Sequence, residues 1–158
     1  MEIRKIQRED NLQMAAIVRD VLMELGAPKI GTAYADPNLE TLYETYNTDR
    51  VVYYVVTNEN KIAGGAGVSQ LDNEAADICE FQKMYFLPEA RGLGFARKIL
   101  DLCLQDAIEF GFTKCYSETM PYMQDAQRLY KNAGFYYLDN PMSNTGHTSC
   151  PVWMMKDL

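Results

Sequence analysis

One short stretch limits this chain more than any other: PEARGLGFARKI, residues 88–99, stands between an apolar run and an amphipathic run. The run before it predicts a long strand, and the run after it repeats apolar residues at helical spacing. Glycines at such a junction reduce stability unless the backbone needs them. The unpaired N–H groups and the macrodipole at a helix start favour an anion. The stretch therefore predicts an anion-binding turn, to which Arg91 and Arg97 could add charge-assisted hydrogen bonds.

Two common phosphate-binding motifs do not fit this turn. A P-loop needs GxxxxGK followed by Ser or Thr, and the sequence has no such segment. A Rossmann fingerprint needs GxGxxG, of which Gly92 and Gly94 supply the first half, but Arg97 occupies the third glycine position. A Rossmann-type nucleotide binder with affinity for NAD is therefore an alternative that departs from its motif at Arg97.

Length and charge narrow the class of protein further. The 158 residues suggest one domain spanning 1–158. The net charge of −7 is poorly suited to a phosphate backbone, so we expect no nucleic-acid partner. The first ten residues lack the apolar core of a signal peptide and no apolar run could span a bilayer, so we expect a cytoplasmic protein without a membrane partner.

Four cysteines are widely spaced and form no CxxC pair, which predicts reduced structural thiols and no metal site. Cys150 has no base nearby in the sequence, so we do not expect it to act as a nucleophile. The chain has one histidine, His147, in the polar loop NTGHTS. A lone histidine in a loop is usually solvated, and a substrate or catalytic role is the alternative.

The apolar periodicity predicts the element order β-α-α-β-β-β-α-β-α-β-β, with hairpins early and βαβ-like crossovers late. Helices are expected from Asp10, capped with Gln13 and ending before Gly26, and from Asp36, through Tyr46. Two more are expected, one from the glycine turn to Gly111 and one over 121–133. Strands are expected at residues 2–7, 51–57, 62–71, 76–87, 113–119, 135–138 and 151–156, with a turn at 58–61. This order predicts an α/β protein whose mixed sheet carries helices on both faces.

Two segments resemble the GNAT superfamily of N-acetyltransferases. RGLGFA resembles the acyl-CoA-binding pattern Q/R-x-x-G-x-G/A, and CEFQKMYFLPEARGLGFARKIL resembles the family's fourth strand, pyrophosphate loop and third helix. AQRLYKNAGFYYL resembles the family's AxxLYxxxGF segment. The resemblance covers the whole chain in element order. It implies a mostly antiparallel sheet of six to seven strands, splayed to form an acyl-CoA cleft, and acetyl-CoA as the cosubstrate.

The resemblance also assigns residues to the cofactor. It implies that successive backbone amides of the turn bind the pyrophosphate and that the preceding strand end pairs with the pantetheine arm. Many members carry an asparagine seven residues before the tyrosine of the second segment, where this chain has methionine; the methionine packs but cannot donate a hydrogen bond. The cofactor-binding assignment comprises Met84, Tyr85, Phe86, Arg91, Gly92, Leu93, Gly94, Phe95, Ala96, Arg97, Met123 and Ala126.

Glu80 is the first candidate for the base that takes a proton from the acceptor amine. Strand periodicity places it on the face of Ile78, Gln82, Met84 and Phe86, and a carboxylate in a partly apolar cleft has a raised pKa. In many family members a glutamate at this strand position is the base. The alternatives are an edge carboxylate paired with Lys83, or Glu118 as the base.

Tyr130 is the candidate general acid. It falls on the tyrosine of the LYxxxGF segment, which in the family points its hydroxyl at the CoA sulfur. Its spacing with Ala126, Leu129 and Ala133 also fits a core aromatic. Other aromatics are expected to be structural: the pairs Tyr53–Tyr54 and Tyr136–Tyr137 with one ring buried each, and Trp153 in the core.

The resemblance implies direct transfer of an acetyl group from acetyl-CoA to a primary amine in a ternary complex. We expect a small-molecule acceptor, shaped by the loops over residues 27–38 and 139–150. The alternatives are a protein or peptide acceptor, through a lysine or an N-terminus, and a non-catalytic acyl-CoA-binding module. A homodimer is expected only by analogy with the family.

Overall fold

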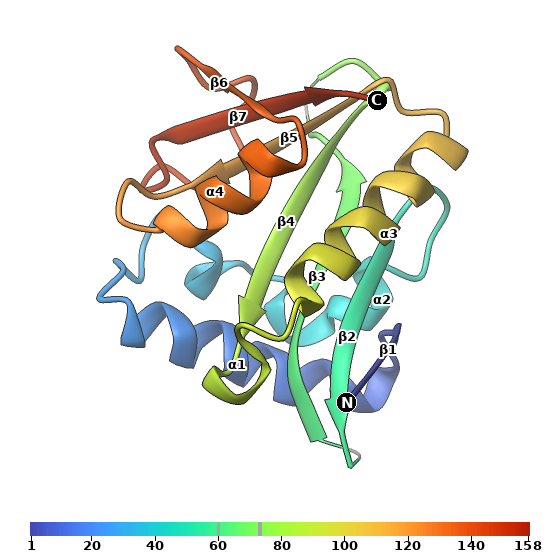
Figure 1. Cartoon of the computed structure of the whole chain (residues 1–158), viewed down its shortest axis with the longest axis vertical. Helices are drawn as coiled ribbons and strands as arrows, with labels where there is room; N and C mark the ends of the chain where they lie inside the picture. The colour runs from blue at the N-terminus through green and yellow to red at the C-terminus, as the bar shows by residue number, and fades with distance from the viewer. Residues whose placement is uncertain (60, 73) are drawn as a thin grey trace.

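The computed structural model describes residues 1–59, 61–72 and 74–158, and its centre is one seven-stranded sheet (Figure 1). The strands are β1 Glu2–Lys5, β2 Val52–Asn58, β3 Lys61–Gln70, β4 Ile78–Phe86, β5 Lys114–Thr119, β6 Tyr136–Leu138 and β7 Val152–Asp157, in the order β1-β2-β3-β4-β5-β7-β6. Only the β4–β5 pair among these neighbours is parallel. This confirms a mixed, mostly antiparallel sheet. The predicted turn at 58–61 includes Asn60, which lies outside the described residues.

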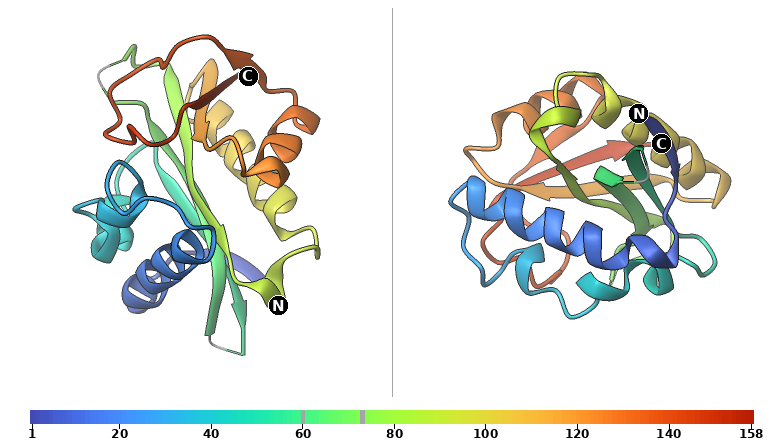
Figure 2. Two further views of the ribbon diagram at one scale, coloured as in Figure 1. Left: turned by 90° about the vertical axis from the view of Figure 1, so that its left-hand side faces the viewer. Right: turned by 90° about the horizontal axis from the view of Figure 1, so that it is seen from below.

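Four α-helices cover the two faces of the sheet. They are α1 Asn11–Glu24, α2 Leu42–Thr45, α3 Phe95–Glu109 and α4 Gln124–Asn132. In the edge-on view of Figure 2, α1 and α2 lie on one face, and α3 and α4 lie on the other. Each face therefore has its own core, one that includes Phe81, Leu100 and Cys103 under α3 and one that includes Met14 and Leu22 of α1.

The prediction that Gln13 is the capping partner of Asp10 at the start of α1 is wrong. A short 3-10 turn, Arg8–Asp10, precedes the helix, and Asp10 accepts a hydrogen bond from the Gln7 N–H at 2.8 Å. The Gln13 side chain instead accepts from the Ile62 N–H at 3.1 Å. A tertiary contact with β3 therefore takes the side chain that local sequence assigns to the cap.

Two further expectations need correction. The second helix does not start at Asp36: a 3-10 turn, Leu39–Thr41, leads into the single turn of α2. Tyr136 and Tyr137 are both exposed, because β6 is the outermost strand of the sheet and pairs on one side only. The other pair behaves as expected, with Tyr53 buried and the Tyr54 hydroxyl bonded to Asp106 at 2.7 Å.

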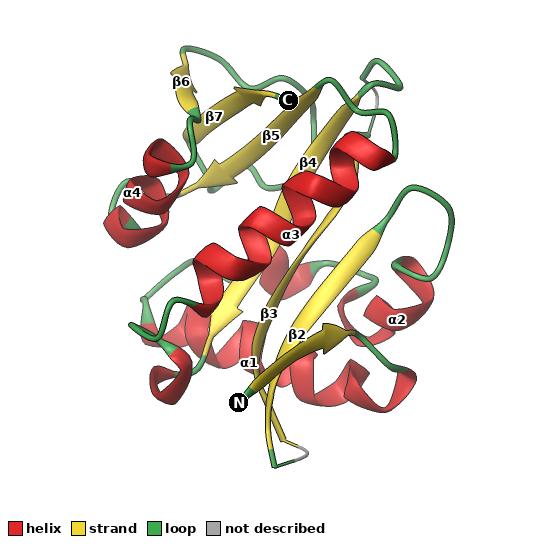
Figure 3. Ribbon diagram, turned by 45° about the vertical axis from the view of Figure 1, so that its right-hand side comes forward, coloured by secondary structure: helices red, strands yellow, loops and turns green. Residues whose placement is uncertain are grey.

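Strands β4 and β5 are joined over a short length and then separate. Their ladder runs from the Ile78–Lys114 pair to the Glu80–Tyr116 pair. One further link follows, in which the Ser117 hydroxyl donates to the Phe81 carbonyl at 3.0 Å. Beyond it the two strands diverge, as Figure 3 shows. The second half of β4 therefore has no strand partner on its β5-facing edge.

A bulge interrupts β4 at Lys83. Gln82 pairs with Gly67 and Tyr85 pairs with Gly65, so two residues of β4 oppose one of β3. Lys83 has a φ of 54°, in the left-handed region. The bulge reverses the alternation of faces: Phe81 before it and Met84 and Phe86 after it all pack in the core under α3. The prediction that Glu80 shares a face with Met84 and Phe86 is therefore wrong.

Candidate active site

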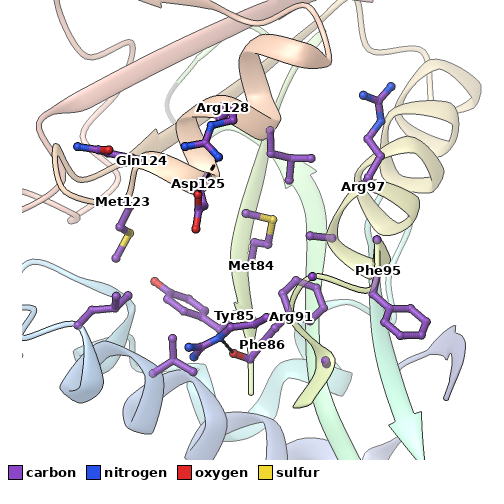
Figure 4. A pocket seen from close by; sticks show the side chains of 18 of the residues that line it. Met84, Tyr85, Phe86, Arg91, Phe95, Arg97, Met123, Gln124, Asp125 and Arg128 are labelled. Carbon is purple, nitrogen blue, oxygen red and sulfur yellow. Dashed lines mark hydrogen bonds and ion pairs between the residues drawn. The ribbon is translucent and has the colours of Figure 1, made fainter. Parts of the chain in front are cut away.

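A cleft of about 630 Å³ lies where β4 separates from β5, between the start of α3 and the start of α4 (Figure 4). It is lined by every residue that the sequence assigned to the cofactor except Leu93, whose side chain is exposed. The end of α1, the short turn before the glycines and the start of α4 complete its walls with residues that the sequence did not assign to the cofactor: Val21, Leu25, Ala90, Tyr122, Gln124, Asp125, Arg128, Leu129 and Asn132.

The glycine turn opens α3 with two left-handed residues. Gly92 has a φ of 71° and Gly94, the N-cap, a φ of 81°. A Cβ at either position would meet no atom within 4 Å, so backbone conformation, not crowding, calls for glycine here. The first bond of the helix joins the Lys98 N–H to the Gly94 carbonyl at 3.1 Å. The amides before it have no partner inside the helix, as an anion site requires.

The two arginines of the turn are held in ion pairs. Arg91 forms a bidentate pair with Glu24 at the end of α1, at 2.7 and 2.8 Å, and its Nε donates to the Phe86 carbonyl. Arg97 pairs with Asp101 one turn along α3. Backbone amides are therefore the donors that the turn leaves free, and Arg91 fastens the turn to α1.

A second group of polar residues is buried at the opposite end of β4. A carboxylate oxygen of Glu80, one of Glu118 and a ring nitrogen of His147 all lie within 4.8 Å of one another. Glu80 is only 6 % exposed, and burial, with the nearby charge of Glu118, raises its pKa to about 7. A carboxylate with that pKa suits a general base near neutral pH.

Asp36 joins this group to the loops. Its Oδ1 lies 2.9 Å from His147 Nε2, and its Oδ2 lies 2.8 Å from Lys83 Nζ. Burial works to raise the pKa of Asp36, but the hydrogen bond from His147 and the charge of Lys83 outweigh it and lower that pKa. Lys83 therefore pairs with Asp36, and the expected alternative of a Glu80–Lys83 pair does not occur among the described residues.

His147 is largely buried, with 12 % of its side chain exposed. The prediction of a solvated loop histidine is therefore wrong. Its Nδ1 lies 3.9 Å from Glu118 Oε2. Burial works to lower the pKa of His147, but the hydrogen bond to Asp36 and that carboxylate's charge outweigh it and raise that pKa. No sequence signal could have found this arrangement, because Asp36 and His147 are 111 residues apart.

Glu118 is fixed from two sides. The Tyr116 hydroxyl donates to its Oε1 at 2.8 Å and the Thr145 hydroxyl donates to its Oε2 at 2.7 Å. Both bonds hold the carboxylate as a hydrogen-bond acceptor. Glu118 also lines a second pocket of about 470 Å³, together with Pro141, Met142, Ser143, Asn144, Thr145, Gly146, His147, Thr148, Cys150 and Trp153.

Two predictions concern residues of this second pocket. Trp153 packs only partly against the small cluster around Tyr116 and also lines the pocket, so the prediction of a core tryptophan holds in part. Burial raises the pKa of Cys150 to about 12, which leaves little thiolate and agrees with its exclusion as a nucleophile.

Tyr130 of α4 is buried, and its ring packs against Phe81 and Phe135, with centroids 6.0 and 5.4 Å away. Burial raises the pKa of its hydroxyl to about 12, so the group keeps its proton near neutral pH. The ring of Tyr130 is therefore part of the core, as the alternative reading expected. Its hydroxyl is in the protonated form that a general acid needs.

Tyr46 is a further buried group near the polar cluster. Among the described residues its hydroxyl has no hydrogen-bond partner. Burial and then the charge of Glu80 raise its pKa. An unpaired buried hydroxyl is unfavourable for folding, and Tyr46 lines neither of the two pockets. Sequence reasoning treated Tyr46 only as part of an apolar helix stripe.

The Glu80–Glu118–His147 group also has donor atoms that a divalent metal ion accepts. The 3.9 Å edge between His147 Nδ1 and Glu118 Oε2 is longer than the roughly 3.4 Å expected between two tetrahedral zinc ligands. The expectation of a metal-free site stays a prediction.

The fold and the cleft agree with comparisons to known proteins. Residues 19–135 match the model of the acetyltransferase (GNAT) family, and the chain belongs to this family. The uncharacterized N-acetyltransferase YjgM of Escherichia coli is 40% identical over 158 residues, covering 99% of this chain and 94% of that protein. The chain is thus an N-acetyltransferase by family.

Solved structures share the fold. An acetyltransferase of the GNAT family from Staphylococcus aureus superposes with a TM-score of 0.86 at 22% identity, covering 99% of this chain and 98% of that chain. The PaiA N-acetyltransferase from Thermoplasma acidophilum, in complex with coenzyme A, has a TM-score of 0.72 at 16% identity, covering 99% and 98%. Within the described part of the chain, no helix has both the length and the apolar character needed to cross a membrane.

Proposed function

We propose that this N-acetyltransferase transfers an acetyl group from acetyl-CoA to the primary amine of a small molecule, by direct attack in a ternary complex. The observation that carries the proposal is the position of two sites along one strand. The free edge of β4 over Met84–Phe86 lines the large cleft, and Glu80 of the same strand lies in the polar cluster beside the second pocket. A cofactor thioester and an amine would meet near the bulge between them.

The cleft supports acetyl-CoA as the donor. The open amides before α3 and the two left-handed glycines suit a pyrophosphate, and the free edge of β4 suits an extended pantetheine arm. The Thermoplasma relative of the same fold contains coenzyme A. Acetyl-CoA would supply the activated thioester, and Met123 and Ala126 of the α4 start would pack against its chain.

The chain's own residues would move two protons. Glu80 accepts a proton from the amine as its nitrogen attacks the carbonyl carbon, and its pKa of about 7 suits this task. The protonated Tyr130 hydroxyl gives a proton to the departing thiolate. Holding both substrates together supplies a further large part of the rate enhancement.

The loops support a small acceptor. Residues 27–38 and 139–150 are fastened to each other by the Asp36–His147 bond, by Ser149 N–H donating to the Gly31 carbonyl at 2.9 Å, and by Ser149 Oγ donating to the Ile30 carbonyl at 3.0 Å. A pocket of about 470 Å³ behind such joined loops fits a small molecule better than a peptide. The carboxylates of Glu80 and Glu118 would attract a protonated amine.

Two experiments test this function. Titration calorimetry should show acetyl-CoA binding and no binding of NAD; the opposite result would remove the cofactor assignment and favour a Rossmann-type binder. Thiol release from acetyl-CoA should then rise with one class of small amine in a panel that also contains lysine peptides and free N-terminal peptides. Transfer to the peptides alone would favour a protein acceptor, and binding without transfer would favour a non-catalytic module.

A further inference from the structure

Glu80 is a base with a poor route to solvent. Only 6 % of Glu80 is exposed. A base that accepts one proton per reaction must release it before the next reaction. A neighbouring titratable group can carry the proton away from Glu80.

His147 is the neighbour placed to do so. One of its ring nitrogens lies within 4.8 Å of a Glu80 oxygen, a distance that one bridging water molecule spans. The same side chain lines the second pocket, which Glu80 does not. A Glu118 oxygen lies within the same 4.8 Å limit, but its carboxylate is held as the acceptor of hydrogen bonds from Tyr116 and Thr145.

Asp36 prepares the imidazole for this task. A carboxylate only accepts, so His147 Nε2, at 2.9 Å from Asp36 Oδ1, carries the ring hydrogen. The neutral ring then has its lone pair on Nδ1, which faces Glu118 at 3.9 Å. When Nδ1 takes a proton, the charge of Asp36 stabilises the imidazolium.

We propose that His147, held by Asp36, is the proton carrier between Glu80 and the second pocket. This inference rests on the proposed function. The proton that Glu80 takes from the amine passes from its carboxyl oxygen to His147 Nδ1, and the imidazolium then releases it to water or buffer in the pocket. Glu80 returns to its carboxylate form and the imidazole to its neutral form, so no other reactant is needed. Asp36 acts as a positioning residue.

Charged and titratable groups face His147 from several elements. Asp36 comes from the 27–38 loop, Glu118 from β5, Glu80 and Lys83 from β4, and Cys150 from the same loop as His147. The carboxylates of Asp36 and Glu80 favour the imidazolium, whereas Lys83 and burial oppose it. Replacing a carboxylate in this set should therefore weaken proton binding at His147.

The first test uses the fact that His147 is the sole histidine of the chain. In tag-free protein its imidazole gives one set of NMR signals. We expect the neutral ring to carry its hydrogen on Nε2, and Asp36→Asn and Glu80→Gln each to lower the midpoint of its titration. A neutral ring with its hydrogen on Nδ1, or a titration that neither substitution moves, would overturn the proposal.

The second test measures turnover. His147→Ala should lower kcat about 100-fold, leave the KM for acetyl-CoA unchanged, and recover activity when imidazole is added, because the pocket is large enough to admit it. Asn140→Ala, an exposed change in the same loop outside the pocket, is the control. A purely structural role would lower activity in a way that imidazole does not restore, and that result overturns the proposal.

Different results would overturn the proton-carrier role of His147 and the proposed acetyl transfer. Wild-type protein that transfers acetyl groups to an amine, with His147→Ala unaffected, overturns the proton carrier alone. Wild-type protein that binds acetyl-CoA and transfers to no amine overturns the proposed function and the carrier with it. His147→Gln repeats the turnover test with a side chain closer in size, should His147→Ala fail to fold.

Discussion

His147 Nε2 and Asp36 Oδ1 lie 2.9 Å apart, although 111 residues separate them in the sequence. Their bond joins the loop over residues 27–38 to the loop that lines the second pocket, and it leaves His147 Nδ1 directed toward Glu118. Because Asp36 also pairs with Lys83 at the β4 bulge, the loops are fastened to the strand that carries Glu80. The polar cluster around Glu80 is thus joined to the loops through one partly buried carboxylate that belongs to no motif.

Tyr130→Phe tests the general acid. The phenylalanine ring keeps the contacts with Phe81 and Phe135, so folding should be preserved. We expect kcat to fall about 100-fold while acetyl-CoA affinity stays within about twofold. In the proposed mechanism the hydroxyl protonates the CoA thiolate as it leaves, and it adds little to the binding of acetyl-CoA before the reaction. Steady-state kinetics and calorimetry measure the two values, with Tyr136→Phe, an exposed tyrosine, as the control. Unchanged turnover would remove Tyr130 from the mechanism.

Glu80→Gln tests the base through the pH dependence of the rate. With a pKa of about 7, Glu80 is ionised only at higher pH, so wild-type kcat/KM should rise as pH increases through that value. Glutamine cannot take the proton, and the rise should disappear together with most of the activity. Because Glu80, Glu118 and His147 interact, the midpoint belongs to the group and not to one residue. A profile that keeps its acidic limb in Glu80→Gln would point to Glu118 or solvent as the base, and Glu89→Gln is the surface control.

The same substitution should change stability in a pH-dependent way. Burial raises the pKa of Glu80 from 4.5 to about 7, so its contribution to stability is complete below pH 4.5 and is lost as pH rises through about 7. The free energy of unfolding of Glu80→Gln, relative to wild type, should therefore increase between pH 5 and pH 8, by up to about 3 kcal/mol. Urea denaturation at the two pH values measures it. If the difference in unfolding free energy does not vary with pH, the pKa of Glu80 is not raised by folding.

The two glycines that flank α3 allow an effect on cofactor binding to be distinguished from an effect of backbone strain. Gly94 at its start and Gly111 beyond its end have φ values of 81° and 84°, and a Cβ at either would meet no atom within 4 Å. Each alanine substitution should reduce stability by about 1 kcal/mol, since both residues are left-handed. Only Gly94→Ala should also weaken acetyl-CoA binding, by about tenfold, because only that residue belongs to the turn. Thermal unfolding and calorimetry test the pair, and equal affinities in the two variants would contradict the pyrophosphate assignment.

Much of the fold could be predicted because its signals are local. The β-branched runs, the amphipathic runs and the glycines after Leu25 and Phe110 mark where elements begin and end, and all seven strands and four helices occur in the predicted order. Local reasoning failed where a distant partner competes. The Gln13 side chain accepts a hydrogen bond from β3 instead of capping the helix start. The Tyr136–Tyr137 pair is exposed because it lies on the outermost strand, which pairs on one side only.

The sequence by itself determined the glycine turn and its chemistry, because left-handed glycines followed by an amphipathic run place free amides at a helix start whatever surrounds them. The tertiary structure alone decided the polar cluster around Glu80. The bulge at Lys83 changes which face of β4 each later residue takes, and strand periodicity cannot reveal it. The burial that raises the pKa of Glu80, and the meeting of Asp36 with His147, arise only when separate loops pack over the sheet, because burial and charge proximity are properties of the folded chain.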